Sequence, residues 1–355
     1  MPLVAHTDLP AYQRLRDEGF QVLSPEQTIA TGIPSLHIGM LNLMPDAALQ
    51  ATERQFLRLL SAGRKMVYVY VHLFTVDGVG RQGPANAHVE SCYEDFEDIK
   101  RCGLDALLVT GANPANPVLS EEGFWPAMIE VLDWGRDHVS SIMCSCLATH
   151  AVVQHHHGAE RTKLPEKRWG VYSHRLLSTD HPLVNGVNSR FDAPHSHVYE
   201  VTEEQLTAHN IRVLAISEEA GVHLAVSEDN FKFIFFQGHP EYDSFSLLKE
   251  YKREVMRFSN GVRNDYAEFP RHYFTQAASE RLSEYRRQML QSDDPECFFQ
   301  RFSELEFGLE IENTWTDTGM AMFGKWIDLV HGVSERTGVY RPGIDPRDPL
   351  GLVAG

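Results

Sequence analysis

The chain has 355 residues, and 32 Lys and Arg against 49 Asp and Glu give it a formal net charge of −17. This balance argues against general binding of nucleic acids or anionic membranes, because phosphate groups reward clustered Lys and Arg. Hydrophobic residues make up 43% of the chain, which is enough to bury a core and excludes a disordered protein. No apolar run approaches the roughly 18 residues needed to cross a bilayer, and the N-terminus lacks the pattern of a secretion signal.

The cysteines are odd in number and irregularly spaced: Cys92, Cys102, Cys144, Cys146 and Cys297. A chain of this length needs no disulfides to fold, so this usage favours a reducing cytoplasm. The close pair Cys144 and Cys146 lacks the second pair expected of a zinc site. The run His155–His157 is expected to end a helix, and consecutive helical residues point in different directions. We therefore expect no metal site.

The predicted elements alternate between strands and helices over the first half of the chain. After an N-terminal arm at residues 1–35, strands are predicted at 36–44, 66–74, 104–110 and 139–145. Helices are predicted at 49–60, 124–134 and 147–154. Strands that alternate with helices through short connections predict an α/β protein with a parallel sheet covered on both faces.

The second half changes character. Residues 170–237 read as short antiparallel strands and turns, a helix is predicted at about 244–258, and the remainder looks mainly helical, with a tail rich in Pro and Gly from Pro342. We expect three parts, namely the arm at 1–35, a catalytic α/β domain at 36–262 and a helical extension at 263–355 packed on it. Residues 275–312 look like an insertion, and the sequence does not decide whether this segment forms a lid or an oligomer contact.

Cys146 is the candidate nucleophile because it stands between the fourth predicted strand and the helix that follows. A nucleophile at such an elbow projects above the sheet, and the helix N-terminus favours a thiolate. Small residues stand two positions away on either side, at Cys144 and Ala148. The backbone N–H of Leu147 would be placed to stabilise an oxyanion. A buried structural thiol is the alternative interpretation, and for Cys144, inside the strand, it is the preferred one.

His239 and Glu241 are the candidate base and its orienting carboxylate. They follow a predicted strand that begins at Phe231 and ends at Gly238, and they are separated only by Pro240, which favours an extended residue before it. A neutral imidazole can take a thiol proton while a carboxylate fixes its tautomer. A His-Pro turn beside a solvated glutamate is the alternative. Together, Cys146, His239 and Glu241 form a plausible set for covalent catalysis.

Several short motifs carry a resemblance to a known family. They occur in the order Asn42-Leu-Met-Pro45, Gln55-Phe-Leu-Arg-Leu-Leu60, Phe96-Glu-Asp-Ile99, Val109-Thr-Gly-Ala112, Cys146 with Ala148, Gly170-Val-Tyr172, Ala193-Pro-His-Ser196 and Gly238-His-Pro-Glu-Tyr-Asp243. The pattern resembles the homoserine O-acyltransferases of the homoserine O-succinyltransferase type, which act in methionine biosynthesis. The match covers roughly residues 36–260, with a weaker one from Asn313 to Trp326.

The resemblance implies a flavodoxin-like fold of the class I glutamine amidotransferase type and a ping-pong reaction. In that reaction, Cys146 takes the acyl group from an acyl-coenzyme A and passes it to the γ-hydroxyl of L-homoserine. His239 acts as base and acid, oriented by Glu241. By matching positions, the substrate is held by Lys167, Ser196 and Arg253. No bound cofactor is implied, because the acyl-coenzyme A is a co-substrate.

The acyl donor depends on a position just after Thr110-Gly-Ala. Family members that prefer acetyl donors have a glutamate there, and succinyl-preferring members have a small residue. The matching residue is Ala115, which leaves room for a second carboxylate, so the resemblance implies succinyl-coenzyme A. The family usually has lysines just after Met-Pro, where this chain has Asp46-Ala47-Ala48. This difference weakens the inference that lysines here contact the coenzyme or the oxyanion.

Other functions stay open at this stage. Acetyl-coenzyme A as donor or serine as acceptor would need only small changes in a pocket. A glutamine amidotransferase or related amide hydrolase shares the fold and the triad, although its elbow commonly reads Gly-x-Cys-x-Gly. A non-catalytic protein that binds a small molecule is the third alternative. We expect small-molecule partners, no nucleic acid or membrane, and a homodimer.

Overall fold

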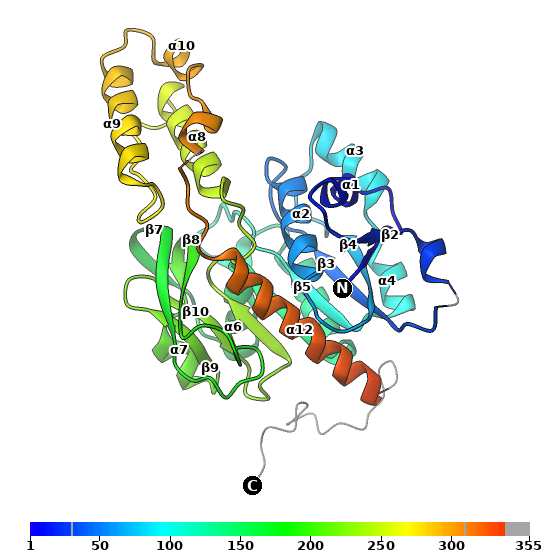
Figure 1. Cartoon of the computed structure of the whole chain (residues 1–355). Helices are drawn as coiled ribbons and strands as arrows, with labels where there is room; N and C mark the ends of the chain where they lie inside the picture. The colour runs from blue at the N-terminus through cyan, green and yellow to red at the C-terminus, as the bar shows by residue number, and fades with distance from the viewer. Residues whose placement is uncertain (30, 309, 338–355) are drawn as a thin grey trace.

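A computed structural model describes residues 1–29, 31–308 and 310–337. Within them, one mixed sheet runs through the molecule in the order β2-β1-β4-β3-β5-β6-β11-β10-β9-β7-β8, with helices on both faces and a group of helices at one end (Figure 1). The expected α/β fold with a mainly parallel sheet and a helical C-terminal region is therefore confirmed. No helix of this part of the chain is both long and apolar enough to span a membrane.

The parallel part of the sheet comprises β1 (Leu3–Val4), β2 (Val22–Leu23), β3 (Ser35–Leu41), β4 (Tyr68–Phe74), β5 (Ala106–Val109), β6 (Ser141–Ser145) and β11 (Phe233–Phe236). Its central strands are continuous apolar runs, as expected of strands covered on both faces. The predicted strand at 36–44 ends at Leu41, and Asn42, the next residue, donates its side-chain amide to the Tyr93 hydroxyl at 2.9 Å. The first 35 residues supply β1 and β2, whereas the division into three domains stays a prediction.

The antiparallel part comprises β7 (Thr162–Leu176), β8 (Arg190–Glu200), β9 (Arg212–Ser217) and β10 (Gly221–Val226). The predicted antiparallel region is present, but β7 begins at Thr162 rather than near Gly170. The sequence hides this start because 162–168 is polar, contains Pro165, and pairs with β8 through a register shift between Lys163 and Arg168.

Twelve α-helices are described in these residues. They are α1 (Pro10–Asp17), α2 (Leu49–Leu60), α3 (Gly83–Cys92), α4 (Phe96–Cys102), α5 (Trp125–His138), α6 (Leu147–His157), α7 (Glu203–Ala208), α8 (Ser246–Ser259), α9 (Gln276–Leu290), α10 (Pro295–Phe299), α11 (Glu304–Gly308) and α12 (Thr316–Thr337). Short 3-10 turns lie at Pro25–Thr28 and Leu119–Glu121. The predicted bounds of α2 agree with the structure because its apolar residues keep a helical period throughout.

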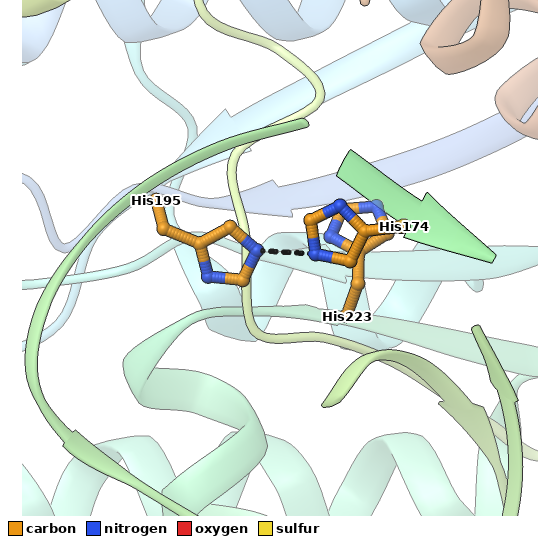
Figure 2. A group of neighbouring side chains, drawn as sticks. All are labelled: His174, His195 and His223. Carbon is orange, nitrogen blue, oxygen red and sulfur yellow. Dashed lines mark hydrogen bonds between the residues drawn. The ribbon is translucent and has the colours of Figure 1, made fainter. Parts of the chain in front are cut away.

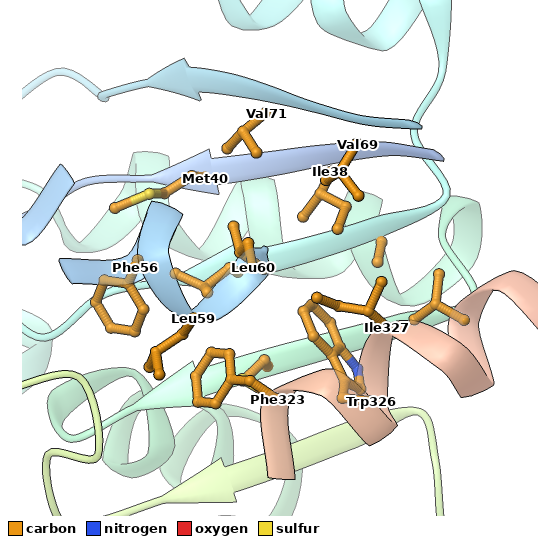
Figure 3. Close-up of a cluster of buried hydrophobic side chains, with 14 of the residues drawn as sticks. Ile38, Met40, Phe56, Leu59, Leu60, Val69, Val71, Phe323, Trp326 and Ile327 are labelled. Carbon is orange, nitrogen blue, oxygen red and sulfur yellow. The ribbon is translucent and has the colours of Figure 1, made fainter. Parts of the chain in front are cut away.

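One face of the sheet is closed by the C-terminal helix α12 together with α1 and α2 (Figure 3). Phe323 lies between Phe56 of α2 and Phe236 of β11, with ring centroids 6.1 and 5.7 Å away. The fully buried Trp326 donates its indole N–H to the Ser141 hydroxyl at 2.9 Å, which satisfies the one polar atom it buries. Helix α12 is thus part of the main core, beneath the strands that lead to Cys146 and His239.

The opposite face is covered mainly by α4, α5, α6 and α7. A third apolar cluster joins α8 to α9, α10 and α11, which form the helical group at the top of Figure 1. The segment at 275–312 therefore packs on α8 through residues such as Leu282, Tyr285 and Phe302. The predicted Pro/Gly-rich tail from Pro342 lies outside the described residues.

Candidate active site

Cys146 occupies a strained elbow between β6 and α6. Its backbone has φ 49° and ψ −105°, a conformation that costs a non-glycine residue about 1–3 kcal/mol. Its N–H donates to the Phe236 carbonyl of β11 at 2.7 Å, which fixes the turn against the neighbouring strand. Leu147 opens α6 directly afterwards, so its N–H stands at the positive end of the helix. The elbow therefore presents the thiol and a backbone donor together.

His239 reaches Cys146 because β6 and β11 are adjacent and parallel, with Ser145 level with Phe236. The His239 Nδ1 atom lies 2.8 Å from Glu241 Oε1, and the imidazole lines the same cavity as the Cys146 thiol, near enough for their charges to interact. His239 and Glu241 are 5% and 4% exposed. Burial opposes a charged imidazole, but Glu241 and then Cys146 outweigh it and hold the pKa of His239 well above its usual value. The three side chains form a thiol–imidazole–carboxylate chain.

The loop after His239 is tied to α2. Asp243 pairs with Arg54 and, at 2.7 Å, with Arg58, and its carboxylate also accepts a hydrogen bond from Gln55 at 3.2 Å. Arg58 donates in addition to the backbone carbonyl of Glu241 at 3.3 Å. Two of the sequence motifs, the one beginning at Gln55 and the one ending at Asp243, are therefore joined in space, and together they position the imidazole.

A cavity of about 480 Å³ opens over this chain of side chains. Its lining includes every sequence-predicted site residue except the buried Glu241, namely Ala115, Cys146, Leu147, Lys167, Ser196, His239 and Arg253. Ala115, Cys146 and His239 follow the carboxyl ends of parallel strands, as expected for a site at that edge of an α/β sheet, while Lys167 and Ser196 lie within β7 and β8 and Arg253 lies on α8. Pockets of this size commonly hold small organic molecules.

Glu250 of α8 links the predicted substrate-binding residues, and sequence reasoning missed it. Its carboxylate accepts hydrogen bonds from Ser196 Oγ at 2.6 Å, Lys167 Nζ at 3.1 Å and the Tyr242 hydroxyl at 2.7 Å. Burial works against its ionised form, yet Lys167, Ser196 and Tyr242 lower its pKa below the usual value. Tyr242 also stacks on His239, with ring centroids 4.4 Å apart. Glu250 is thus a buried anion in the cavity wall.

Arg161 is a second lining residue that the sequence did not single out. Its guanidinium stacks over Tyr199 at 3.9 Å from the ring centroid and donates to the backbone carbonyls of Asn116 and Pro117 at 3.2 and 3.0 Å. Those carbonyls belong to the loop that carries Ala115. Burial lowers the pKa of Arg161, with smaller opposing effects from Tyr199 and Cys146, but an arginine keeps its charge at neutral pH.

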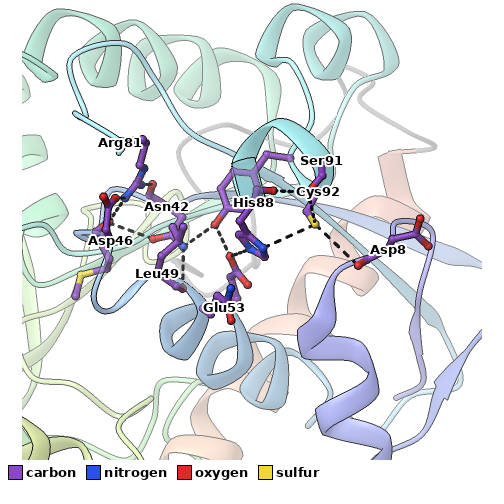
Figure 4. Close-up of polar contacts among 12 residues, drawn as sticks. Asp8, Asn42, Asp46, Leu49, Glu53, Arg81, His88, Ser91 and Cys92 are labelled. Atoms are coloured by element: carbon purple, nitrogen blue, oxygen red, sulfur yellow. Dashed lines mark hydrogen bonds and ion pairs between the residues drawn. The ribbon is translucent and has the colours of Figure 1, made fainter. Parts of the chain in front are cut away.

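The loop at 42–48 forms another wall of the cavity and is held from behind by polar contacts (Figure 4). Arg81 donates to the carbonyls of Met44 and Asn42 at 2.5 and 2.9 Å and pairs with Asp46 at 3.4 Å. At the position where the homoserine O-acyltransferases have a lysine after Met-Pro, this chain thus has Asp46. Asp46 is paired with Arg81, and neither residue lines the cavity.

Helix α8 lines the mouth of the cavity with Lys249, Arg253 and Arg257, spaced four residues apart on one side of the helix. Arg257 lies 3.5 Å from Glu254, while Arg253 has no ion-pair partner among the described residues. In a chain of net charge −17, this row of cations is a local exception that suits an anionic ligand.

A cysteine, a histidine and a glutamate at the carboxyl edge of an α/β sheet define an enzyme-like site of the covalent-catalysis type. Such a site can transfer an acyl group or hydrolyse an amide, so geometry alone leaves the class of reaction open.

Comparison with known proteins identifies the family to which the chain belongs. A family model described as "HTS: Homoserine O-succinyltransferase" matches residues 2–336. A protein of Methylobacter tundripaludum named "Homoserine O-succinyltransferase" is 50% identical over 354 residues, which cover 99% of this chain and 100% of the relative. A protein of the same name from Allochromatium vinosum is 49% identical and covers both chains completely. The chain therefore belongs to the homoserine O-succinyltransferase family, and the predicted family is confirmed.

The glutamine amidotransferase from Methylobacillus flagellatus aligns with 88% of this chain and 98% of its own, at 13% identity and a TM-score of 0.43.

Proposed function

We propose that this protein transfers a succinyl group from succinyl-coenzyme A to the γ-hydroxyl of L-homoserine through a Cys146 acyl-enzyme, giving O-succinyl-L-homoserine for methionine biosynthesis. The observation that carries the proposal is that the strained Cys146 and His239 line the same cavity and interact electrostatically, while Glu241 lies 2.8 Å from His239 Nδ1. Membership in the homoserine O-succinyltransferase family and the full-length relatives of that name support the substrates.

In the first half-reaction, His239 Nε2 takes the proton of Cys146, because its Nδ1 is occupied by Glu241. The thiolate attacks the thioester carbonyl, and the Leu147 N–H stabilises the negative charge that develops on the oxygen. The carbon–sulfur bond to coenzyme A then breaks, and the imidazolium of His239 returns its proton to the leaving thiolate. The succinyl group is left on Cys146 as a thioester.

In the second half-reaction, His239 takes the proton of the homoserine hydroxyl, and the resulting oxygen nucleophile attacks the Cys146 thioester. The ester leaves and Cys146 recovers its proton from the imidazolium. Glu241 stabilises the imidazolium in both halves, which is the role of the carboxylate in such triads.

The amino acid fits the wall formed by α8 and β8. Glu250 is a buried anion that suits the α-ammonium group, and Arg253 can pair with the carboxylate through two parallel hydrogen bonds. Lys167 and Ser196 already donate to Glu250, so they hold its carboxylate in place. We assign this wall to the acceptor.

The donor fits the loop that carries Ala115 and, for its coenzyme A part, two cations of α8 on either side of Arg253. Ala115 adds neither bulk nor negative charge, and Arg161 beside its loop supplies a cation for the free carboxylate of a succinyl group. Lys249 and Arg257 at the mouth suit the phosphate groups of coenzyme A. An acetyl group has no carboxylate to bring to the Arg161 cation, so these contacts favour succinyl.

A panel of two donors and two acceptors tests the substrates. With succinyl- or acetyl-coenzyme A crossed with homoserine or serine, kcat/KM should be highest for succinyl-coenzyme A with homoserine. A higher kcat/KM for acetyl-coenzyme A, or for serine, would overturn the corresponding part of the assignment.

The cytoplasmic location and the homodimer are likewise proposals, and the five unpaired cysteines suit a reducing compartment.

A further inference from the structure

Three buried histidines from separate strands converge behind the catalytic loop (Figure 2). His174 lies on β7, His195 on β8 and His223 on β10, and each is at most 1% exposed. One nitrogen of each ring lies within 4.8 Å of the corresponding nitrogens of the other two. None of the three lines the cavity, so the proposed acyl transfer leaves this cluster without a role.

The hydrogen bonds of this cluster do not balance with neutral rings. His174 Nδ1 contacts the Tyr172 carbonyl at 2.8 Å, and its Nε2 contacts His195 Nε2 at 3.1 Å. His195 Nδ1 contacts His197 Nε2 at 2.9 Å, and His197 Nδ1 contacts the Tyr199 carbonyl at 2.7 Å. Each of these four contacts needs one hydrogen, but three neutral imidazoles carry only three. The four contacts of His174, His195 and His197 therefore require one additional positive charge.

A cation between His174 and His195 restores the balance. With both Nε2 lone pairs directed at the cation, His174 donates to the Tyr172 carbonyl, His195 donates to His197, and His197 donates to the Tyr199 carbonyl. Three rings then supply three hydrogens to three contacts. A ligating histidine that donates its other N–H to a carbonyl is the usual arrangement around metal ions.

His223 brings a third nitrogen to the same place. It stands at a β-bulge, because Val222 pairs with Ile216 and Leu224 with Ala215, which leaves His223 without an opposite residue. Its Nδ1 is buried and has no hydrogen-bond partner. A methyl group added to Gly238 would lie 2.6 Å from this nitrogen and 2.7 Å from His195 Nε2. Both nitrogens therefore face the space that Gly238 leaves free.

We propose that His174, His195 and His223 form a site for one divalent transition-metal ion of the zinc type. Tetrahedral zinc at its usual bond length places neighbouring nitrogens about 3.3 Å apart, close to the 3.1 Å between His174 and His195. The donor set is three neutral imidazoles, which suits zinc better than calcium or magnesium. This proposal departs from the sequence-based expectation of no metal site.

A second histidine cluster differs because it contains a carboxylate. His72 donates to Glu94 at 2.9 Å and accepts from His37 at 2.9 Å, and His6 contacts Glu94 at 3.1 Å. His6 also faces the Val4 carbonyl through its Nδ1 at 3.3 Å, and here the carboxylate of Glu94 supplies a negative charge next to the rings. The hydrogen bonds of His174 and His195, by contrast, run only to other histidines and to the Tyr172 carbonyl, and none of them involves a carboxylate.

The ion would act as a positioning element for the catalytic base. It would join β7, β8 and β10 beside Gly238, the residue before His239. The backbone N–H of His239 already donates to the backbone carbonyl of Pro194, the residue before His195, at 2.7 Å. A metal bound here would therefore hold the backbone that carries His239 without touching the substrates.

The test is a metal titration of the full-length protein after removal of metal by a chelator. Co²⁺ is added while the visible absorption of nitrogen-bound Co²⁺ is recorded, and Zn²⁺ is then added to displace it. We expect one equivalent to bind, and the metal should raise the thermal unfolding midpoint. The variant His223→Leu removes one ligand and should bind at least about tenfold more weakly. His155→Gln, in a surface group with Asp133, is the matched control and should bind as the parent does.

Three results would overturn the proposal. The parent protein could bind no stoichiometric metal, His223→Leu could bind as tightly as the parent, or His155→Gln could abolish binding. The first would mean that the missing charge is a proton, and the others that the ion sits elsewhere. The parent titration stands even if His223→Leu fails to fold. Because metal content is measured without acyl transfer, failure of this site and failure of the proposed reaction are distinguishable.

Discussion

Replacing Arg161 by glutamine should reduce succinyl transfer selectively. The guanidinium lines the cavity, stacks 3.9 Å above the Tyr199 ring centroid and donates to the carbonyls of Asn116 and Pro117. It is also near enough to Cys146 for their charges to interact. A succinyl group on Cys146 would therefore place its free carboxylate in reach of this cation, whereas an acetyl group has no carboxylate to place there.

The magnitude follows from the lost contact. A hydrogen bond to a charged partner contributes about 1.5–3 kcal/mol, and each 1.4 kcal/mol corresponds to about a factor of ten. Because Arg161 is only half-buried, solvent screening favours the lower part of that range. We expect kcat/KM for succinyl-coenzyme A to fall about 10- to 50-fold in Arg161→Gln, and kcat/KM for acetyl-coenzyme A to change less than about threefold.

The assay measures release of the coenzyme A thiol with each donor at saturating homoserine. Loss of the contacts to Asn116 and Pro117 would loosen the loop for both donors alike, so the ratio of the two kcat/KM values isolates the charge. Arg161→Lys keeps the charge and should retain most of the ratio. An unchanged succinyl-to-acetyl ratio in Arg161→Gln would refute the assignment of this cation to the donor.

Three further predictions concern the same cavity. Ala115→Glu places an anion beside Arg161, so the donor ratio should shift toward acetyl-coenzyme A; steady-state kinetics with both donors would show it, and no shift would contradict the role of Ala115. Arg257→Gln should raise KM for the acyl donor severalfold and leave KM for homoserine unchanged; an equal rise in both would contradict the assignment of the cavity mouth to coenzyme A. Glu241→Gln removes the main charge that raises the pKa of His239, so the alkaline limb of kcat/KM should move to lower pH. The stabilisation from a raised histidine pKa is complete below the ordinary value and is lost as pH rises through the raised one. The parent's alkaline loss of thermal stability should therefore be smaller in Glu241→Gln, and identical pH profiles would contradict the coupling.

The parallel core, the elbow at Cys146 and the contact of His239 with Glu241 could be predicted from the sequence because those features are local. Apolar runs mark β3 to β6, and the helical period gives both ends of α2. The position of Cys146 between a strand and a helix predicts an elbow, and the structure has positive φ there. His239 and Glu241 are two residues apart, so their contact needs only the short turn through Pro240.

Other features depend on contacts between distant segments. Glu250 looks like a solvent-facing residue of an amphipathic helix, and only the convergence of Lys167, Ser196 and Tyr242 buries it. Arg161 lies in a polar stretch with no motif. The three clustered histidines come from β7, β8 and a bulge of β10, and no spacing in one segment predicts a bulge. Strands β1 and β2 have two residues each, too few for a periodic signal.

The most direct test of the account is the intact mass of the protein after incubation with succinyl-coenzyme A alone. The account predicts one added succinyl group, absent in Cys146→Ala, present in the matched variant Cys144→Ala, and lost from the parent protein when homoserine is added. A parent protein that stays unmodified while still forming product with homoserine, or a succinyl group that persists in Cys146→Ala, would contradict the covalent transfer through Cys146.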